Sequence, residues 1–206
     1  SRLSLALLLC VIGATLLSAR QFDRPESVDE HTSSTPSTYR AAAVDYAPVV
    51  MAAYSPTPVT RTQALGIMQA NLVQLDSITA SAASSRAQII VFPEDALYGP
   101  MFPTRDSVFP YLEYIPDINQ MDDRGRVCPC HDAAFADDST AVLRNLSCMA
   151  ISHSLVLVAN MGEVRYCIGS HASTTEAGCP ADGRFQYNTQ VVFDEQGYLL
   201  AKYHKS

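Results

Sequence analysis

The chain has 206 residues, of which 48% are hydrophobic and 17% are charged, and its formal net charge is -7. That length and apolar content suffice for one domain with a buried core. The acidic balance, with a pI near 5.1 and no basic cluster, argues against nucleic acid or an anionic membrane surface as a partner.

The first 19 residues have the features of a secretory signal peptide. Arg2 is a short positive start, residues 3–17 are apolar, and small residues up to Ala19 suit a cleavage site. A membrane anchor is the alternative, but the run is short for a span of about 20 residues, and no other segment is apolar enough to span. We expect residues 1–19 to be a signal peptide and the polar residues 20–38 to be a flexible leader.

Residues 60–84 have the pattern of an amphipathic helix. Thr60 and Gln63 have the spacing of a capping box, and apolar side chains then recur every three or four positions. Residues 88–92 follow as an apolar run, typical of a strand buried on both faces. With a small-residue strand at 39–46 before the helix, this order predicts an α/β fold.

The rest of the chain continues the alternation of helix and strand after a long irregular segment at 98–137. A second amphipathic helix is predicted over 140–153, with Asp138 or Ser139 as its cap. The further elements that we expect are a short helix within 107–114, a strand over 155–160 that ends at Met161-Gly162, and a strand hairpin over 185–203.

Chemistry-bearing residues stand at two predicted strand ends. Pro93 ends the strand at 88–92, because proline has no N–H for a sheet ladder, and Glu94 and Asp95 follow. Ligand sites in α/β sheets are built where strands end, and a carboxylate beside apolar neighbours can have a raised pKa and act as a general base. A solvated loop or a helix cap is the alternative. Lys205 ends the final strand and could meet Glu94 at one edge of the sheet.

Five cysteines follow the predicted signal peptide: Cys128, Cys130, Cys148, Cys167 and Cys179. A secreted chain favours disulfides, and we expect Cys130–Cys148 and Cys167–Cys179 with Cys128 unpaired. The Cys-Pro-Cys spacing is too tight for a comfortable bridge within itself. A zinc site with His131 or His171 is the alternative, which the irregular spacings fit poorly.

Two further features carry predictions with alternatives. Asn145 begins an N-glycosylation sequon, but its place within a predicted helix leaves its use open. Tyr98 and Phe102, on the segment after Glu94, could line a substrate pocket, or they could pack as a satellite of the core.

Three stretches carry a family resemblance when they are taken in order: IIVFPEDALYG, LSCMA followed by LVLVANMG, and CPADGRFQYNTQVVFDEQGYLLAKYHK. Together they resemble the carbon–nitrogen hydrolase (nitrilase) superfamily, and within it the vanin and biotinidase branch of secreted or surface-anchored amidases. The Pro-Glu-Asp tripeptide alone is a weak signal, whereas the combination is specific. The resemblance covers residues 39–205 and implies part of a nitrilase-type α-β-β-α sandwich.

The resemblance also implies a Glu, Lys, Cys triad that needs no metal or organic cofactor. Glu94 matches the general base and Lys205 matches the catalytic lysine. The family's nucleophilic cysteine lies downstream of that lysine, so no cysteine of this chain takes that role. Because the chain starts without methionine and stops at Ser206, we expect residues 39–206 to be the truncated N-terminal part of a hydrolase domain. Asn188 is expected to tie down the site by hydrogen bonds.

Two functions from different classes follow from these observations. The first is a secreted amidohydrolase whose small-molecule substrate is a linear amide, of the pantetheine or biotin-amide kind, with a possible lipid anchor beyond Ser206. The second is a non-catalytic secreted fragment or pseudoenzyme that acts by binding. A cysteine on the next strand distinguishes them. Without that cysteine the chain is expected to be inactive, because catalytic groups act as a unit.

Overall fold

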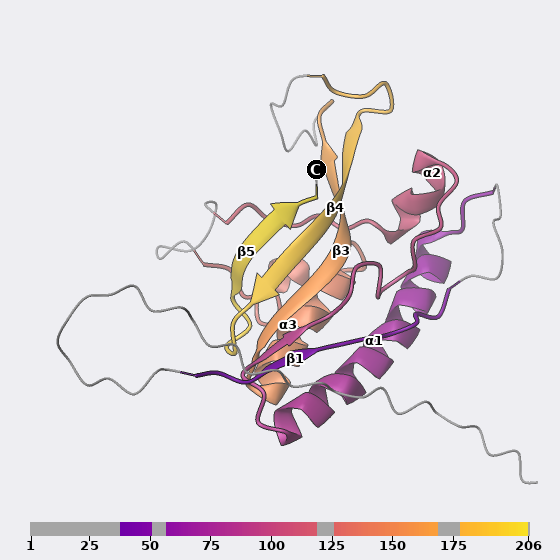
Figure 1. The fold of residues 1–206 in the computed structure, drawn as a ribbon. Helices are drawn as coiled ribbons and strands as arrows, with labels where there is room; N and C mark the ends of the chain where they lie inside the picture. The colour runs from indigo at the N-terminus through magenta and orange to yellow at the C-terminus, as the bar shows by residue number, and fades with distance from the viewer. Residues whose placement is uncertain (1–37, 51–56, 119–125, 169–177, 206) are drawn as a thin grey trace, which may run out of the picture.

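The computed structural model describes residues 38–50, 57–118, 126–168 and 178–205, so the predicted signal peptide and most of the leader lie outside the described residues. Five strands form one sheet in the order β1-β2-β3-β4-β5 (Figure 1). They are β1 (Ala41–Ala43), β2 (Ile89–Val91), β3 (Val156–Tyr166), β4 (Arg184–Phe193) and β5 (Leu199–His204). The first three strands run parallel, and β4 and β5 are added antiparallel at one edge. The predicted α/β class and the hairpin are confirmed.

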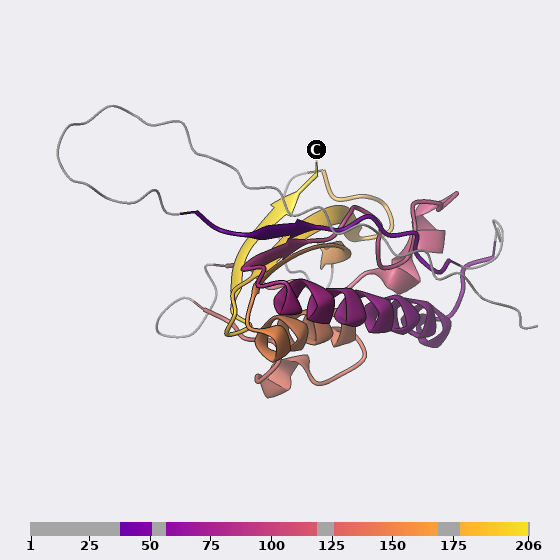
Figure 2. The same cartoon turned by 60° about the horizontal axis from the view of Figure 1, so that its bottom comes forward.

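Helices α1 (Arg61–Ser84) and α3 (Ala141–His153) lie side by side on one face of the sheet (Figure 2). The predicted capping box of α1 is present: the Thr60 side chain accepts from the Gln63 backbone N–H, and the Gln63 side chain accepts from the Thr60 backbone N–H. The core fills the space between these helices and the sheet. Its largest fully buried side chains include Phe193, Met68 and Leu157.

The cap of α3 differs from the prediction. Thr140, rather than Asp138 or Ser139, is the N-cap residue, and its side chain makes no capping hydrogen bond. The carboxylate of Glu113 accepts from the first amides of the helix instead, those of Val142 at 3.0 Å and Leu143 at 2.8 Å. A negative charge from a distant segment therefore satisfies the helix N-terminus, which local sequence could not indicate.

The second face of the sheet carries no helix among the described residues. Val91 is 37% exposed and Tyr203 is 65% exposed there. The expectation that the strand at 88–92 is buried on both faces is therefore wrong for the described part of the chain, where only Ile90 of β2 is fully buried. The helices cover only one face of β2, whereas its continuous apolar sequence is typical of a strand that is buried on both faces.

Strand β3 is longer than predicted, because it continues through Gly162 to Tyr166. A Cβ at Gly162 would lie 2.4 Å from Leu112 Cδ2 and 3.1 Å from the Tyr98 hydroxyl oxygen. The glycine therefore marks a close approach of neighbouring side chains in the middle of a strand, not the end of the strand.

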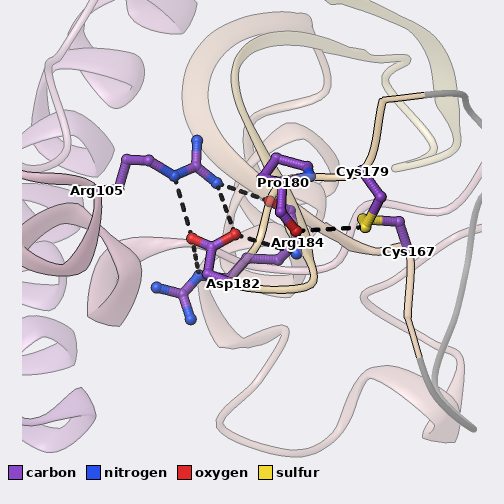
Figure 3. Close-up of a disulfide and its surroundings, with 6 residues drawn as sticks. All are labelled: Arg105, Cys167, Cys179, Pro180, Asp182 and Arg184. Atoms are coloured by element: carbon purple, nitrogen blue, oxygen red, sulfur yellow. Dashed lines mark hydrogen bonds and ion pairs between the residues drawn. A yellow bond between two sulfur atoms is a disulfide. The ribbon is translucent and has the colours of Figure 1, made fainter.

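The segment predicted to be irregular contains three short helical turns: α2 (Arg105–Val108), η1 (Phe109–Tyr111) and η2 (Ala133–Phe135). The short helix expected within 107–114 thus starts earlier, because Thr104 caps it by accepting from the Ser107 backbone N–H. Arg105 then ties α2 to the β3–β4 connection through Asp182, at 3.1 Å, and through the Arg184 carbonyl oxygen, at 2.7 Å (Figure 3).

Both predicted disulfides are present, and Cys128 is free as expected. Cys130–Cys148 fastens the segment before η2 to α3, and Cys167–Cys179 joins the two ends of the β3–β4 connection (Figure 3). Because these four sulfurs are bonded in pairs, they are not available as zinc thiolates. His171, a ligand of the alternative zinc site, lies outside the described residues.

Candidate active site

Glu94 and Lys205 are brought together by the parallel and the antiparallel parts of the sheet. The Lys205 Nζ donates to Glu94 Oε1 at 2.5 Å, although 111 positions separate the two residues in sequence. Glu94 follows Phe92 and Pro93 after the end of β2, and Lys205 directly follows β5. The side chains are 44% and 60% exposed respectively, so the pair faces open space on the side without helices.

A chain of amide hydrogen bonds holds this pair from the strands beneath it. Asn188 Nδ2 donates to Glu94 Oε1 at 2.7 Å, and Asn160 Nδ2 donates to Asn188 Oδ1 at 2.5 Å. Asn160 Oδ1 in turn accepts from the Asp95 backbone N–H at 3.0 Å, where the backbone has a positive φ of 61°. The predicted hydrogen-bonding role of Asn188 is confirmed.

Asn160 was not singled out from the sequence. It stands at the end of an apolar run in the sequence. Its importance becomes visible only in the fold, where its side chain lies on the same face of the sheet as the candidate site. The side chain points to the same face as Asn188, and together they fix the turn that presents Glu94. Asn160 is only 4% exposed. A buried polar side chain needs hydrogen-bond partners, and those of Asn160 come from the two segments that form the site.

The hydrogen bond from Lys205 is the main influence that holds the pKa of Glu94 below its usual range. The raised pKa expected for this carboxylate is therefore wrong for the described residues, because Glu94 is half exposed and paired with an ammonium rather than surrounded by apolar groups. The pKa of Lys205 is raised by the same bond. The neighbouring Asp95 has a raised pKa, caused first by burial and then by the charge of Glu94.

A small hollow beside the pair is lined by Glu94, Asn160, Asn188, Gln190, Tyr203 and Lys205. Tyr98 and Phe102 are not among these residues. Their rings lie 5.5 Å apart between centroids, and both pack on Tyr111. Tyr98 is only 7% exposed and belongs to the buried core. In the described residues both rings pack as the core-packing alternative has it, with Phe102 only partly buried, and a pocket role for them stays a prediction.

The described residues place no thiol beside Glu94. Four cysteines form disulfides, and the Cys128 sulfur contacts the Ser147 hydroxyl and the Gln196 carbonyl oxygen. Gln196 is in the turn before β5, whereas Lys205 follows the other end of that strand. In the same residues, no cluster of three or more His, Cys, Asp or Glu side chains could hold a metal ion.

Comparison with known proteins identifies the family to which this chain belongs. The carbon-nitrogen hydrolase family matches residues 40–206, which is most of the chain. The chain belongs to this family.

Similar proteins lie in the vanin and biotinidase branch. The chain is 44% identical over 175 residues to the pantetheinase of Mus musculus, covering 84% of this chain and 31% of that protein. It is 43% identical over 175 residues to the pantetheinase of Homo sapiens, with the same coverage, and 41% identical over 170 residues to the biotinidase of Mus musculus, covering 81% and 30%. The chain thus spans about a third of the length of these relatives.

Among solved structures, the chain is similar to an amidase of Nesterenkonia from the nitrilase superfamily, with a TM-score of 0.41 and 21% identity over 82% of this chain and 44% of that one. An N-terminal amidase matches with a TM-score of 0.40 and 17% identity, over 73% and 26%. None of the helices in the described residues combines the length and the apolar character needed to cross a membrane.

Proposed function

We propose that this chain is the base- and lysine-bearing part of an amidohydrolase that cleaves a linear amide of the pantetheine or biotin-amide kind. The observation that carries the proposal is the contact of Lys205 Nζ with Glu94 Oε1 at 2.5 Å. These two residues match the family's base and lysine, and the fold brings them into one hollow although 111 positions separate them in sequence. The names of the similar proteins, pantetheinase and biotinidase, suggest the substrate class.

In the proposed mechanism the nucleophile is a cysteine that the family supplies downstream of Lys205. A thiol with a pKa of about 8.5 is mostly protonated at neutral pH, so the Glu94 carboxylate takes its proton as attack on the amide begins. The ammonium of Lys205 favours the thiolate and stabilises the oxyanion of the tetrahedral intermediate. The protonated Glu94 then gives its proton to the leaving amine, and the carboxylate afterwards activates water against the thioester.

The lowered pKa of Glu94 fits the first of these steps, because the group must be ionised before it can accept a proton. Asn188 donates to the same oxygen as Lys205, which leaves Oε2 as the oxygen directed to a thiol in this scheme. No step of the proposed mechanism uses a metal or an organic cofactor.

The proposal includes export from the cell. Two disulfides suit an oxidising compartment, and the signal-peptide pattern agrees with that. Asn145 is exposed on α3, as a glycan acceptor must be, although its side chain also donates to the Ala141 carbonyl oxygen at 2.8 Å. Secretion, glycan attachment and a C-terminal lipid anchor are parts of the proposal that expression in a eukaryotic cell line would test.

The experiment is steady-state hydrolysis by the full-length protein that contains this chain and the family's cysteine. We expect it to hydrolyse pantetheine or a biotin amide, and we expect Glu94→Gln to lower kcat by at least about a hundredfold, because general base catalysis contributes about 10²–10⁴ in rate. Glu195→Gln is the matched control, since Glu195 is exposed in the β4–β5 turn. Hydrolysis of neither amide would favour the alternative of a binding protein or pseudoenzyme. Full activity in Glu94→Gln would contradict the proposed role of Glu94 as the general base.

A further inference from the structure

A second charged cluster lies beneath β3, β4 and β5, on the face opposite the Glu94–Lys205 pair. At its centre is Glu163 of β3, whose side chain has no exposed surface. Its Oε1 accepts from Arg165 Nε and Lys202 Nζ, both at 2.8 Å. Its Oε2 accepts from the Thr189 hydroxyl at 3.1 Å and lies 2.8 Å from His204 Nε2. One carboxylate therefore joins three adjacent strands.

Two of these contacts reach β5, the strand at the edge of the described sheet. An edge strand is paired on one side only, so its last residues fray unless other contacts hold them. Glu163 holds both Lys202 and His204 of this strand. The ring of Tyr187 also stacks on His204, with 3.9 Å between centroids and 8° between the planes.

The anchored end of β5 is adjacent to the candidate lysine. Side chains alternate along a strand, so His204 points to the helix side while Lys205 points to the opposite face and reaches Glu94. The Lys205 backbone N–H donates to the Asn188 carbonyl oxygen at 2.9 Å, which continues the ladder by one residue. Any slip or fraying at His204 would therefore displace the ammonium.

We propose that Glu163 is a positioning residue for Lys205: through Lys202 and His204 it fixes the end of β5 and so holds the ammonium on Glu94. A buried ion cluster adds little net stability over apolar side chains of similar size. What the Glu163 cluster contributes is therefore one fixed arrangement of the end of β5. The catalytic meaning of this role rests on the proposed function. The geometric role does not, because it concerns only where Lys205 lies.

The first test measures Lys205 directly in the full-length protein. The bond with Glu94 raises the pKa of Lys205 and so lowers the fraction of neutral amine, which is the form that reacts with acetic anhydride, and mass spectrometry of Lys205 acetylation therefore reports the pair. His204→Phe keeps a ring to stack on Tyr187 but loses the contact with Glu163, and we expect its acetylation rate to rise severalfold. His204→Gln retains a donor, and we expect its rate to stay within about twofold of the parent.

The second test compares two buried carboxylates. Glu163→Gln is expected to raise the acetylation rate as His204→Phe does. Glu113→Gln is the matched control: Glu113 is 1% exposed and its backbone forms an isolated β-bridge with Glu163, but its carboxylate contacts Arg61 and α3, not β5. If Glu163→Gln does not fold, His204→Phe still decides, since that side chain is 31% exposed and its replacement is better tolerated.

Kinetics give an independent test. A misplacement of a catalytic group by about 1 Å can cost about a hundredfold, so we expect His204→Phe to lower kcat at least about tenfold with KM within about twofold. In a Lys205→Ala background the same change should cost nothing further. Unchanged acetylation in folded Glu163→Gln and His204→Phe, or an equal loss of kcat in the Lys205→Ala background, would overturn the proposal. If acetylation changes as expected but neither amide is hydrolysed, the proposed function fails and the positioning role stands.

Discussion

At the scale of single residues, the ammonium of Lys205 sets the protonation of Glu94. Its hydrogen bond lowers the pKa of the carboxylate, and the stability gained from a lowered carboxyl pKa is present above the unfolded value and lost as the pH falls through the folded one. Because both side chains are largely exposed, solvent screens the pair and its effect on folding is small. The shift matters for reactivity: Glu94 stays ionised in mildly acid solution.

We therefore predict that Lys205→Gln raises the pKa of Glu94 toward the ordinary value for glutamate, about 4.3. The change removes the bond and the charge together but leaves the Asn188 donor. The measurement is a carbon-detected NMR titration of the Glu94 carboxyl in both proteins. An unchanged titration midpoint would contradict the inferred coupling between Lys205 and Glu94. Lys202→Gln is not a suitable control, because the Lys202 side chain contacts Glu163, which is proposed to position Lys205.

Residue identity alone predicted part of this site. Glu94 and Lys205 follow strand ends, and Asn188 lies in a strand that leads to the site, so each could be proposed from the sequence. Asn160 and Glu163 could not. Both are polar residues within β3 whose partners come from elements far away in sequence, and local pattern carries no information about such partners.

At the scale of elements, helix α1 anchors the segments around the site through one buried amide. Asn71 is fully buried; its Oδ1 accepts from the Tyr46 hydroxyl and the Val49 backbone N–H, both at 2.7 Å. Its Nδ2 donates to the carbonyl oxygens of Val49 and Leu97, both at 2.8 Å. Leu97 is three residues after Glu94, so the helix holds the loop that carries the candidate base.

We predict that Asn71→Leu, which keeps a similar volume, lowers the free energy of unfolding by at least about 2 kcal/mol, because it leaves buried backbone groups without partners. Gln74→Leu, on the exposed side of the same helix, should change it by less than about 0.5 kcal/mol. Urea unfolding of the two variants provides the comparison. Equal effects at both positions would show that the amide network does not stabilise α1 against the loop.

The limits of prediction differ between elements. The bounds of α1 follow from its capping box and periodicity, which are local. The bounds of β3 do not, because Gly162 looks like a strand end in sequence, whereas in the fold it is where Leu112 and Tyr98 come close. The cap of α3 was missed for the same reason: its carboxylate comes from Glu113, a distant residue.

At the scale of the whole molecule, the sheet has one face covered by helices and one face that is open in the described residues (Figure 2). The α/β class could be predicted from the order of helices and strands. The exposure of the second face could not be predicted, because an apolar strand sequence indicates burial but does not indicate which residues bury the strand. Val91, Leu200 and Tyr203 are large apolar side chains exposed in this sheet.

We predict that the polypeptide of residues 20–206, expressed alone, binds a hydrophobic dye such as ANS and self-associates, because apolar sheet faces and strand edges promote association. Val91→Thr with Tyr203→Thr should reduce dye binding, whereas Arg144→Gln on the exposed surface of α3 should not. A single cooperative unfolding transition by circular dichroism, without dye binding, would contradict the expectation.

The most direct test of the central claim, that Glu94 and Lys205 act as one catalytic pair, is a double-mutant cycle in the full-length protein. The quantity is kcat/KM for pantetheine in the parent, Glu94→Gln, Lys205→Ala and the double variant. Groups that act as a unit are strongly non-additive, so we predict that the double variant is no more than about tenfold slower than the slower single variant. Losses that multiply across the two sites would contradict the account.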